Sequence, residues 1–139
     1  MQKFTIVSFL IIIVVFNACR KEKITAPKSS ITGKWYWVEQ TYNSYTNNQL
    51  TNHEDYTTIL DPQSYFEFDS DGKFIENPQD RNGQFKYGTY QLKGDSVIIT
   101  DEEEITRWVI KTLSQSSLVI QRSAVEAPFS SVVTYSMKR

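Results

Sequence analysis

Hydrophobic and polar residues alternate along most of the chain after residue 30, with the period of two that is typical of β-strands. In the segment 33–42, for example, Trp35 and Trp37 fall on one face of the expected strand. No stretch with the helical period exceeds two turns. The pattern therefore predicts strands over residues 33–42, 64–69, 73–76, 84–92, 96–100, 105–112, 117–122 and 130–137, with 56–60 as a further short strand or part of a lid.

Short turns join most of these strands. The segment Asp69–Gly72 predicts a tight hairpin turn, because Asp and Gly accept the backbone angles that such turns need. Consecutive hairpins imply antiparallel neighbours, so an all-β fold is expected: an up-and-down antiparallel barrel of eight strands, without exposed edges. Two polar connections, 43–55 and 123–129, are expected to be loops. The interior of such a barrel holds either packed side chains or one small ligand.

A different pattern occupies the N-terminus. Residues 4–16 are mostly apolar and end shortly before Cys19, the only cysteine. As a helix this stretch would cover roughly 20 Å, less than the ~30 Å core of a bilayer, so it is typical of a removable export signal. With Ala18 before the cysteine, it resembles a bacterial lipoprotein signal, in which residues 1–18 are removed and Cys19 becomes the lipidated first residue. An ordinary secretory signal or an uncleaved anchor is the alternative.

The segment from Cys19 to Ser30 is expected to be a flexible basic tether. It carries four basic residues against one acidic residue, contains Pro27 and has few apolar residues. Signal and tether together predict a lipoprotein attached to the bacterial outer membrane through its lipid, on the periplasmic or cell-surface face. The barrel domain would then occupy residues 31–139.

Two motifs resemble those of lipocalins and lipocalin-like domains. Ile31–Trp35 matches their Gly-x-Trp opening, and Phe66–Phe74 matches a Phe-x-Phe-x-x-Asp-Gly-x-Phe hairpin that is common in lipocalin-like lipoproteins of the Bacteroidota. The resemblance extends over nearly the whole expected domain and implies a calycin-type barrel. It also implies that Trp35 lies at the base of the barrel under a basic side chain, which would be Arg139 or Lys138.

Alternation and this resemblance together place a largely aromatic set of side chains inside the barrel. One interpretation is a cavity for a small ligand; the other is a filled core, because aromatic side chains are large and eight strands leave little space. Glu39 shares the parity of Trp37 and is expected either to meet a polar ligand group at the mouth or to reach water at the rim. Tyr42 and Tyr45 are candidates to cover the mouth, with a solvated loop as the simpler interpretation. The candidate ligand-binding residues are Trp35, Trp37, Glu39, Phe66, Phe68, Tyr90, Trp108 and Tyr135.

Charge and residue inventory argue against several function classes. Residues 31–139 carry ten basic and fifteen acidic residues, a net charge of about −5, which argues against a nucleic-acid partner. One cysteine and one histidine, His53, cannot form a Cys/His zinc site, so neither metal nor cofactor is expected. The sequence contains no Gly-x-Ser-x-Gly or His-Glu-x-x-His motif, and an enzyme is not expected.

The sequence therefore predicts a membrane-anchored lipocalin-like lipoprotein that binds a small apolar or amphipathic molecule. The alternative is a filled barrel that acts as a protein-interaction or accessory module of an envelope complex. In that case Tyr36, Tyr42, Tyr45 and the 43–55 connection would contact the partner protein.

Overall fold

The computed structural model describes residues 30–78 and 84–139. The expected signal peptide, Cys19 and nearly all of the tether lie outside the described residues. The described part contains no helix with the length and apolar character needed to cross a membrane.

Within these ranges the chain forms nine strands and one short 3₁₀ helix, η1. Their order and bounds are β1 (Gly33–Thr46), β2 (Gln49–Asp55), η1 (Thr57–Ile59), β3 (Tyr65–Phe68), β4 (Lys73–Asn77), β5 (Lys86–Lys93), β6 (Ser96–Asp101), β7 (Ile105–Leu113), β8 (Ser117–Glu126) and β9 (Phe129–Lys138).

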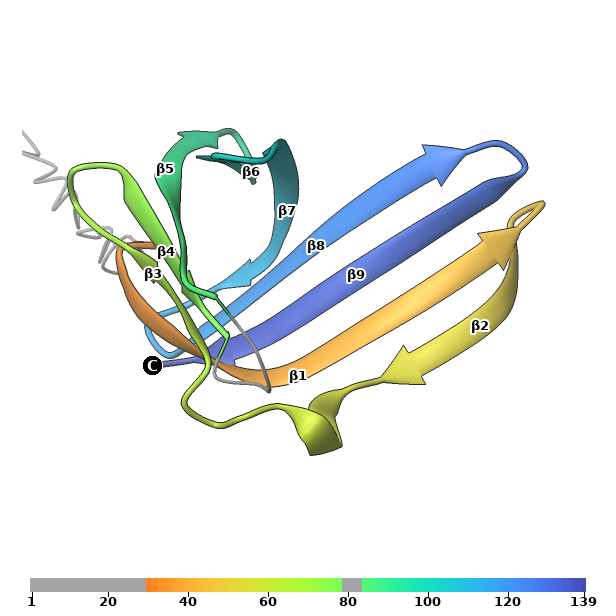
Figure 1. The fold of residues 1–139 in the computed structure, drawn as a ribbon, viewed down its shortest axis with the longest axis horizontal. Coiled ribbons are helices and arrows are strands. Elements are labelled where there is room, and N and C mark those ends of the chain that lie inside the picture. The colour runs from red at the N-terminus through yellow and green to blue at the C-terminus, as the bar shows by residue number, and fades with distance from the viewer. Residues whose placement is uncertain (1–29, 79–83) are drawn as a thin grey trace, which may run out of the picture.

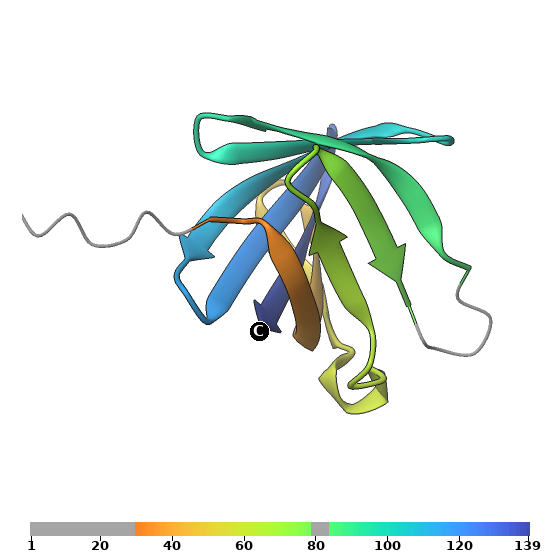
Figure 2. The ribbon, with the colours of Figure 1, turned by 90° about the vertical axis from the view of Figure 1, so that its left-hand side faces the viewer.

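Eight of these strands close into a barrel. From β3 to β9 each strand pairs antiparallel with the next one in the chain, and β1 joins β3 on one side and β9 on the other. Figures 1 and 2 show the ring of strands from two sides. The predicted all-β, up-and-down, eight-stranded antiparallel barrel is therefore confirmed.

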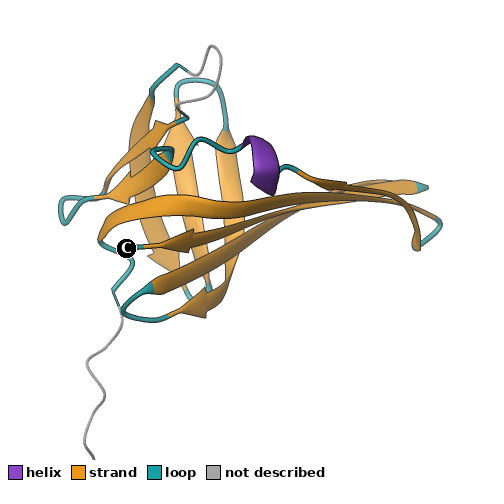
Figure 3. Ribbon diagram, turned by 90° about the horizontal axis from the view of Figure 1, so that it is seen from below, coloured by secondary structure: helices purple, strands orange, loops and turns teal. Residues whose placement is uncertain are grey.

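The ninth strand, β2, lies outside the barrel and belongs to a four-stranded extension. It pairs with the outer half of β1, while the outer halves of β8 and β9 continue the same sheet on the other side. We call this sheet the wing; it comprises residues 41–46, 49–55, 122–126 and 129–134. Figures 1 and 3 show it projecting from one end of the barrel.

The predicted loops at 43–55 and 123–129 are therefore wrong. Tight turns replace them: Asn47 and Asn48 both have positive φ angles, 51° and 63°, the backbone of a two-residue hairpin turn. Ala127 and Pro128 form the second tip, with a cis peptide bond between them. Both faces of the wing reach solvent, so these strands lack the apolar alternation on which the prediction depended.

The segment 56–60, predicted as a strand or part of a lid, contains η1 instead. The Tyr56 N–H donates to the Gln40 carbonyl over 2.9 Å, which ties the segment to β1, and Leu60 packs against the core. Figure 3 shows the helix where the wing meets the barrel.

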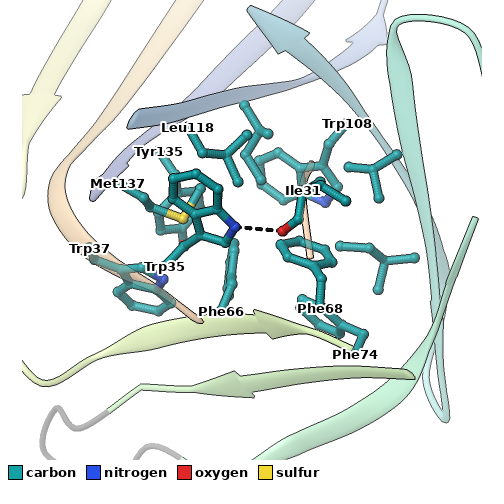
Figure 4. Packing of buried hydrophobic residues seen from close by; sticks show 13 residues of the cluster. Ile31, Trp35, Trp37, Phe66, Phe68, Phe74, Trp108, Leu118, Tyr135 and Met137 are labelled. Atoms are coloured by element: carbon teal, nitrogen blue, oxygen red, sulfur yellow. Dashed lines mark hydrogen bonds between the residues drawn. The ribbon is translucent and has the colours of Figure 1, made fainter. Parts of the chain in front are cut away.

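The core fills the end of the barrel that lies away from the wing. Neighbouring aromatic rings of the core meet at 5.0–6.4 Å between centroids, mostly edge to face, as for Trp37 with Phe66 and Phe66 with Phe74. Figure 4 shows the packing. The buried apolar side chains are Ile31, Trp35, Trp37, Phe66, Phe68, Phe74, Val97, Ile99, Trp108, Leu118, Ile120, Tyr135 and Met137.

The base of the barrel is closed by Trp35 and Arg139. The Trp35 indole N–H donates to the Ile31 carbonyl over 2.6 Å (Figure 4), and the Arg139 guanidinium carbon lies 4.1 Å from the Trp35 ring centroid. Arg139 also donates to the Ser30 and Thr32 carbonyls, each over 2.6 Å. The expected basic partner of Trp35 is therefore Arg139 rather than Lys138.

Candidate functional site

A cavity of about 380 Å³ opens at the mouth of the barrel, where the wing begins. Its floor is apolar and aromatic, and its rim carries charged side chains from β4, β5, β6, β8 and the β6–β7 connection. The lining residues are Gln40, Phe66, Phe74, Glu76, Lys86, Ile99, Asp101, Glu104, Thr106, Trp108, Arg122, Ala124, Ser131, Val133 and Tyr135.

The aromatic floor is rigid because its rings pack on one another. Phe66 lies 5.3 Å from both Phe74 and Tyr135, and Trp108 lies 5.6 Å from Tyr135, between ring centroids. The Trp108 indole N–H donates to the Thr106 hydroxyl over 3.2 Å, which satisfies its polar atom. Trp108 and Tyr135 are each 9% exposed, and both line the cavity. The floor can therefore take an apolar group without rearranging.

Two ion pairs shape the rim. Arg122 and Glu104 form a fork, with nitrogen–oxygen distances of 2.9 and 3.0 Å, and the Lys86 ammonium lies 3.2 Å from Glu103. All four side chains are exposed by a third or more, so these pairs add little stability. Their main effect is to hold charged groups in defined positions around the opening.

Asp101 adds a fixed negative charge to the rim. The backbone N–H groups of Glu104 and Glu103 donate to the Asp101 carboxylate over 2.9 and 2.8 Å. These hydrogen bonds, the one from Glu104 most strongly, hold the pKa of Asp101 below its usual value. The hydrogen bond to Glu103 raises the pKa of Lys86, which is therefore cationic at neutral pH.

The cavity thus combines an apolar floor with a rim of both charges. Three lining carboxylates, Glu76, Asp101 and Glu104, face two lining cations, Lys86 and Arg122. Such an arrangement suits a molecule with an apolar body and a polar end, because the body can leave water while the end stays among charged partners.

A family model described as a lipocalin-like domain matches residues 31–120. This chain belongs to the lipocalin-like domain family. No curated protein matches the chain. The matched residues span β1 to β7 and the start of β8, and they include Trp35 and the β2 strand of the wing.

Two solved structures are similar to this lipocalin-like chain. One is an uncharacterized protein from Bacteroides eggerthii, with a TM-score of 0.48 and 13% identity, covering 79% of this chain and 99% of that one. The other is a lipocalin-like protein from Bacteroides uniformis, with a TM-score of 0.43 and 19% identity, covering 73% of this chain and 94% of that one.

Three of the candidate ligand-binding residues reach the cavity of the lipocalin-like barrel. Phe66, Trp108 and Tyr135 form part of its floor. They come from β3, β7 and β9, which are separated in the sequence and meet only when the barrel closes.

Four other candidates lie in the filled part of the barrel. Trp35, Trp37 and Phe68 are buried in the core and do not line the cavity. Tyr90 packs its ring 5.0 Å from Phe68, and its hydroxyl donates to the Asp69 carbonyl over 2.7 Å. These residues support the floor from below.

Glu39 lies outside the barrel, which corrects its expected orientation. The pairing of β1 with β9 shifts between Trp37 and Glu39, so Val38 is an extra residue and the parity of β1 changes after it. Glu39 is exposed and accepts a hydrogen bond of 3.2 Å from Ser136, while Gln40 takes the place at the mouth.

The sequence interpretation missed most of the polar rim, although a signal for part of it exists. Glu76 follows Phe74 at a spacing of two, and Arg122 follows Ile120 in the same way. Continuing the inward parity to the strand ends would therefore have found both residues. Asp101 follows Ile99 at the same spacing at the end of β6, so the parity of β6 indicates it as well. Glu104 belongs to the β6–β7 connection, for which strand parity makes no prediction.

A second hollow, of about 240 Å³, lies on the wing. Tyr42, Tyr45 and Phe129 are among its lining residues, and Ala124 and Ser131 border both this hollow and the mouth cavity. The two tyrosines thus lie on the wing beside the mouth, as part of a strand rather than of a loop that covers it.

His53 lies on β2, away from the cavity. It is exposed, and its Nδ1 lies 2.6 Å from the Asn43 side-chain oxygen. Within residues 30–78 and 84–139 no cluster of three or more His, Cys, Asp or Glu side chains could hold a metal ion.

Proposed function

We propose that this chain is a membrane-anchored lipocalin-like lipoprotein that binds a small amphipathic molecule in the cavity at the barrel mouth. The observation that carries the proposal is the cavity itself, about 380 Å³ with an aromatic floor and a charged rim. Its volume lies within the ~300–1,000 Å³ range that is usual for small-molecule sites.

The chemistry of the lining favours an amphipathic ligand over a purely apolar one. Burial of apolar ligand surface against Phe66, Trp108 and Tyr135 would contribute about 25 cal/mol per Å² before the costs of association. A purely apolar ligand that also covered Asp101 or Arg122 would remove their water without replacing it, which is unfavourable. A polar end placed among these groups avoids that cost.

Fluorescence of Trp108 provides the test. We expect the purified chain from Arg20 onward to bind at least one member of a panel of fatty acids, bile acids and haem, with a saturable change in tryptophan fluorescence. The variant Trp108→Phe keeps an aromatic floor and should lose most of this change, while native mass spectrometry still detects the bound ligand. No bound species across the panel would count against the proposal.

Binding rather than catalysis is proposed because the mouth carries no histidine or cysteine among its lining residues. The carboxylates there are held by backbone and ion-pair contacts, as for Asp101 and Glu104. The net negative charge of the domain argues against a nucleic-acid partner.

The proposed lipid anchor is supported by the apolar segment 4–16 and the Ala18–Cys19 pair. It would hold the domain at the outer membrane, on the periplasmic or cell-surface face. In cells, Cys19→Ser should abolish labelling with radioactive palmitate and release the domain from membranes. Unchanged membrane retention of Cys19→Ser would indicate an uncleaved anchor instead.

The wing supports a second and compatible role in contact with an envelope protein. It exposes large apolar side chains, among them Leu50, Val125 and Phe129, each more than half exposed. The alternative of a filled barrel that acts only through its surface is less favoured, because the mouth contains the cavity.

A further inference from the structure

The wing has two outer strands, and each has one side without a partner strand in the described part of the chain. At one edge, β2 pairs only with β1. At the other edge, β8 leaves β7 after Gln121, so that Arg122–Glu126 pairs only with β9. Figure 1 shows this part of β8 along the outer margin of the wing. Unpaired backbone groups along such an edge can accept a further strand.

The β2 edge carries the features that protect exposed edges. Its pairing with β1 is interrupted by a bulge at Thr51, and it ends in two acidic residues, Glu54 and Asp55. Bulges and charged side chains oppose the approach of a further strand.

The β8 edge has no bulge, and its two charged residues, Arg122 and Glu126, have opposite signs. The register of β8 with β9 runs without interruption from Ser117 to Glu126, so no bulge interrupts this edge. Residues 122–126 contain neither proline nor lysine, and Val125 in the middle is 79% exposed. This edge is therefore open to strand addition.

We propose that the β8 edges of two copies of this chain pair antiparallel, about a two-fold axis that passes beside Ala124. The two wings then form one continuous sheet, and the two barrels lie at opposite ends of it. The interface is self-complementary, as two-fold symmetry requires.

Charge complementarity favours a second copy of the chain as the partner, and it favours the register centred on Ala124. When Ala124 lies opposite Ala124 of the second copy, Arg122 lies opposite Glu126 of the second copy, and the same pair forms again across the axis. A shift of the axis to Ser123 or Val125 removes both pairs. Opposite charges that face each other across two strands stabilise the pairing, and like charges oppose it.

Arg122 can take part in this contact without leaving the barrel rim. Two of its nitrogens bind Glu104, and the guanidinium has five N–H donors in all. The Arg122 side chain remains 37% exposed, and Glu126 is exposed near the tip of the wing. The ion pair to Glu104 also orients Arg122.

Sedimentation of charge-reversed variants tests the proposal. The chain from Arg20 onward contains every strand described above, and at high concentration it should form dimers. Arg122→Glu and Glu126→Arg should each weaken dimerisation by roughly tenfold or more, because both symmetric pairs become repulsive. An equimolar mixture of the two variants should recover the dimer, since each mixed pair joins opposite charges. Melting curves should show that both variants remain folded.

The register has its own test. The chain from Arg20 onward has no cysteine, so Ala124→Cys introduces a single thiol beside the proposed axis and should form a disulfide-linked dimer under mild oxidation. Val125→Cys, which would face Ser123 of the second copy, should cross-link much less. The proposal is overturned by a monomer at every concentration, by a dimer that neither charge reversal weakens, or by a stoichiometric envelope protein cross-linked at residue 124 in place of a second copy.

Discussion

At the scale of single residues, Arg139 closes the base of the barrel. It lies against the ring of Trp35 and donates to two backbone carbonyls, at Ser30 and Thr32. Arg139→Ala removes all three contacts and should lower the free energy of unfolding by about 1–3 kcal/mol. Urea denaturation monitored by circular dichroism measures the change.

The neighbouring residue supplies a control for this prediction. Lys138 is exposed and makes no described contact with Trp35. Lys138→Ala should change the free energy of unfolding by less than about 0.5 kcal/mol. Equal losses for the two variants would show that Arg139 has no specific role at the base.

Asp101 links stability to pH. Backbone N–H donors hold its pKa below the usual value, so the folded state favours the ionised carboxylate. The contribution of the ionised carboxylate to the free energy of unfolding should be complete above its pKa in the unfolded chain, about 3.9. It should be lost as the pH falls through the lower pKa of the folded state. The free energy of unfolding of Asp101→Asn should therefore lie below that of the unsubstituted chain at pH 6, and the gap should narrow towards pH 2.5. A gap that does not change over this range would contradict the assignment.

Residue-scale prediction from the sequence succeeded at the base and failed at the mouth. The resemblance carried by the Gly-x-Trp motif predicted Trp35 at the base with either Arg139 or Lys138 over it, and the structure selects Arg139. Glu39 was misplaced because the extra residue at Val38 reverses the parity of β1, and nothing in the side chain of a valine distinguishes a bulge from a regular strand position.

At the scale of strands, Gly88 allows β5 and β6 to approach closely. A Cβ atom at Gly88 would lie 2.3 Å from the Thr100 carbonyl oxygen, which belongs to the backbone and cannot rotate away. Gly88→Ala should therefore destabilise the protein by about 3 kcal/mol, as an overpacked site does.

Thr89→Ala serves as the matched control in the same strand. Thr89 is exposed, and its replacement removes side-chain atoms without adding a contact. It should cost at most about 1 kcal/mol, the range of β-sheet propensity. Thermal unfolding of Gly88→Ala and Thr89→Ala tests this prediction. Similar melting temperatures would contradict it and would mean that β6 moves to accommodate the alanine.

The barrel strands could be predicted because one of their faces is buried, which forces apolar and polar residues to alternate. The wing strands are solvated on both faces, so polar residues such as Asn43 and Ser44 can occupy them and no apolar pattern is needed. The turn at Asn47–Asn48 was the remaining local signal, since asparagine tolerates positive φ angles.

At the scale of the whole molecule, closure of eight strands divides the interior into two parts. The tryptophans and phenylalanines near the base fill one end, and the cavity of about 380 Å³ remains at the other. The sequence predicted the barrel and its family but left open whether it was filled. The volume that remains depends on how rings from separate strands interlock, and this cannot be derived from periodicity.

The central claim is that this cavity holds the ligand. Ser131 lines the mouth, whereas Val132, the next residue on β9, does not. Ser131→Phe should fill part of the cavity, and Val132→Phe should add the same ring on the opposite face of the strand.

Native mass spectrometry of these two variants and the unsubstituted chain, each mixed with the tightest-binding molecule of the panel, tests the claim most directly. We predict one bound molecule per chain for the unsubstituted protein and for Val132→Phe, and a loss of at least tenfold in affinity for Ser131→Phe, about 1.4 kcal/mol. Equal binding by all three proteins, or no binding by the unsubstituted chain, would contradict it.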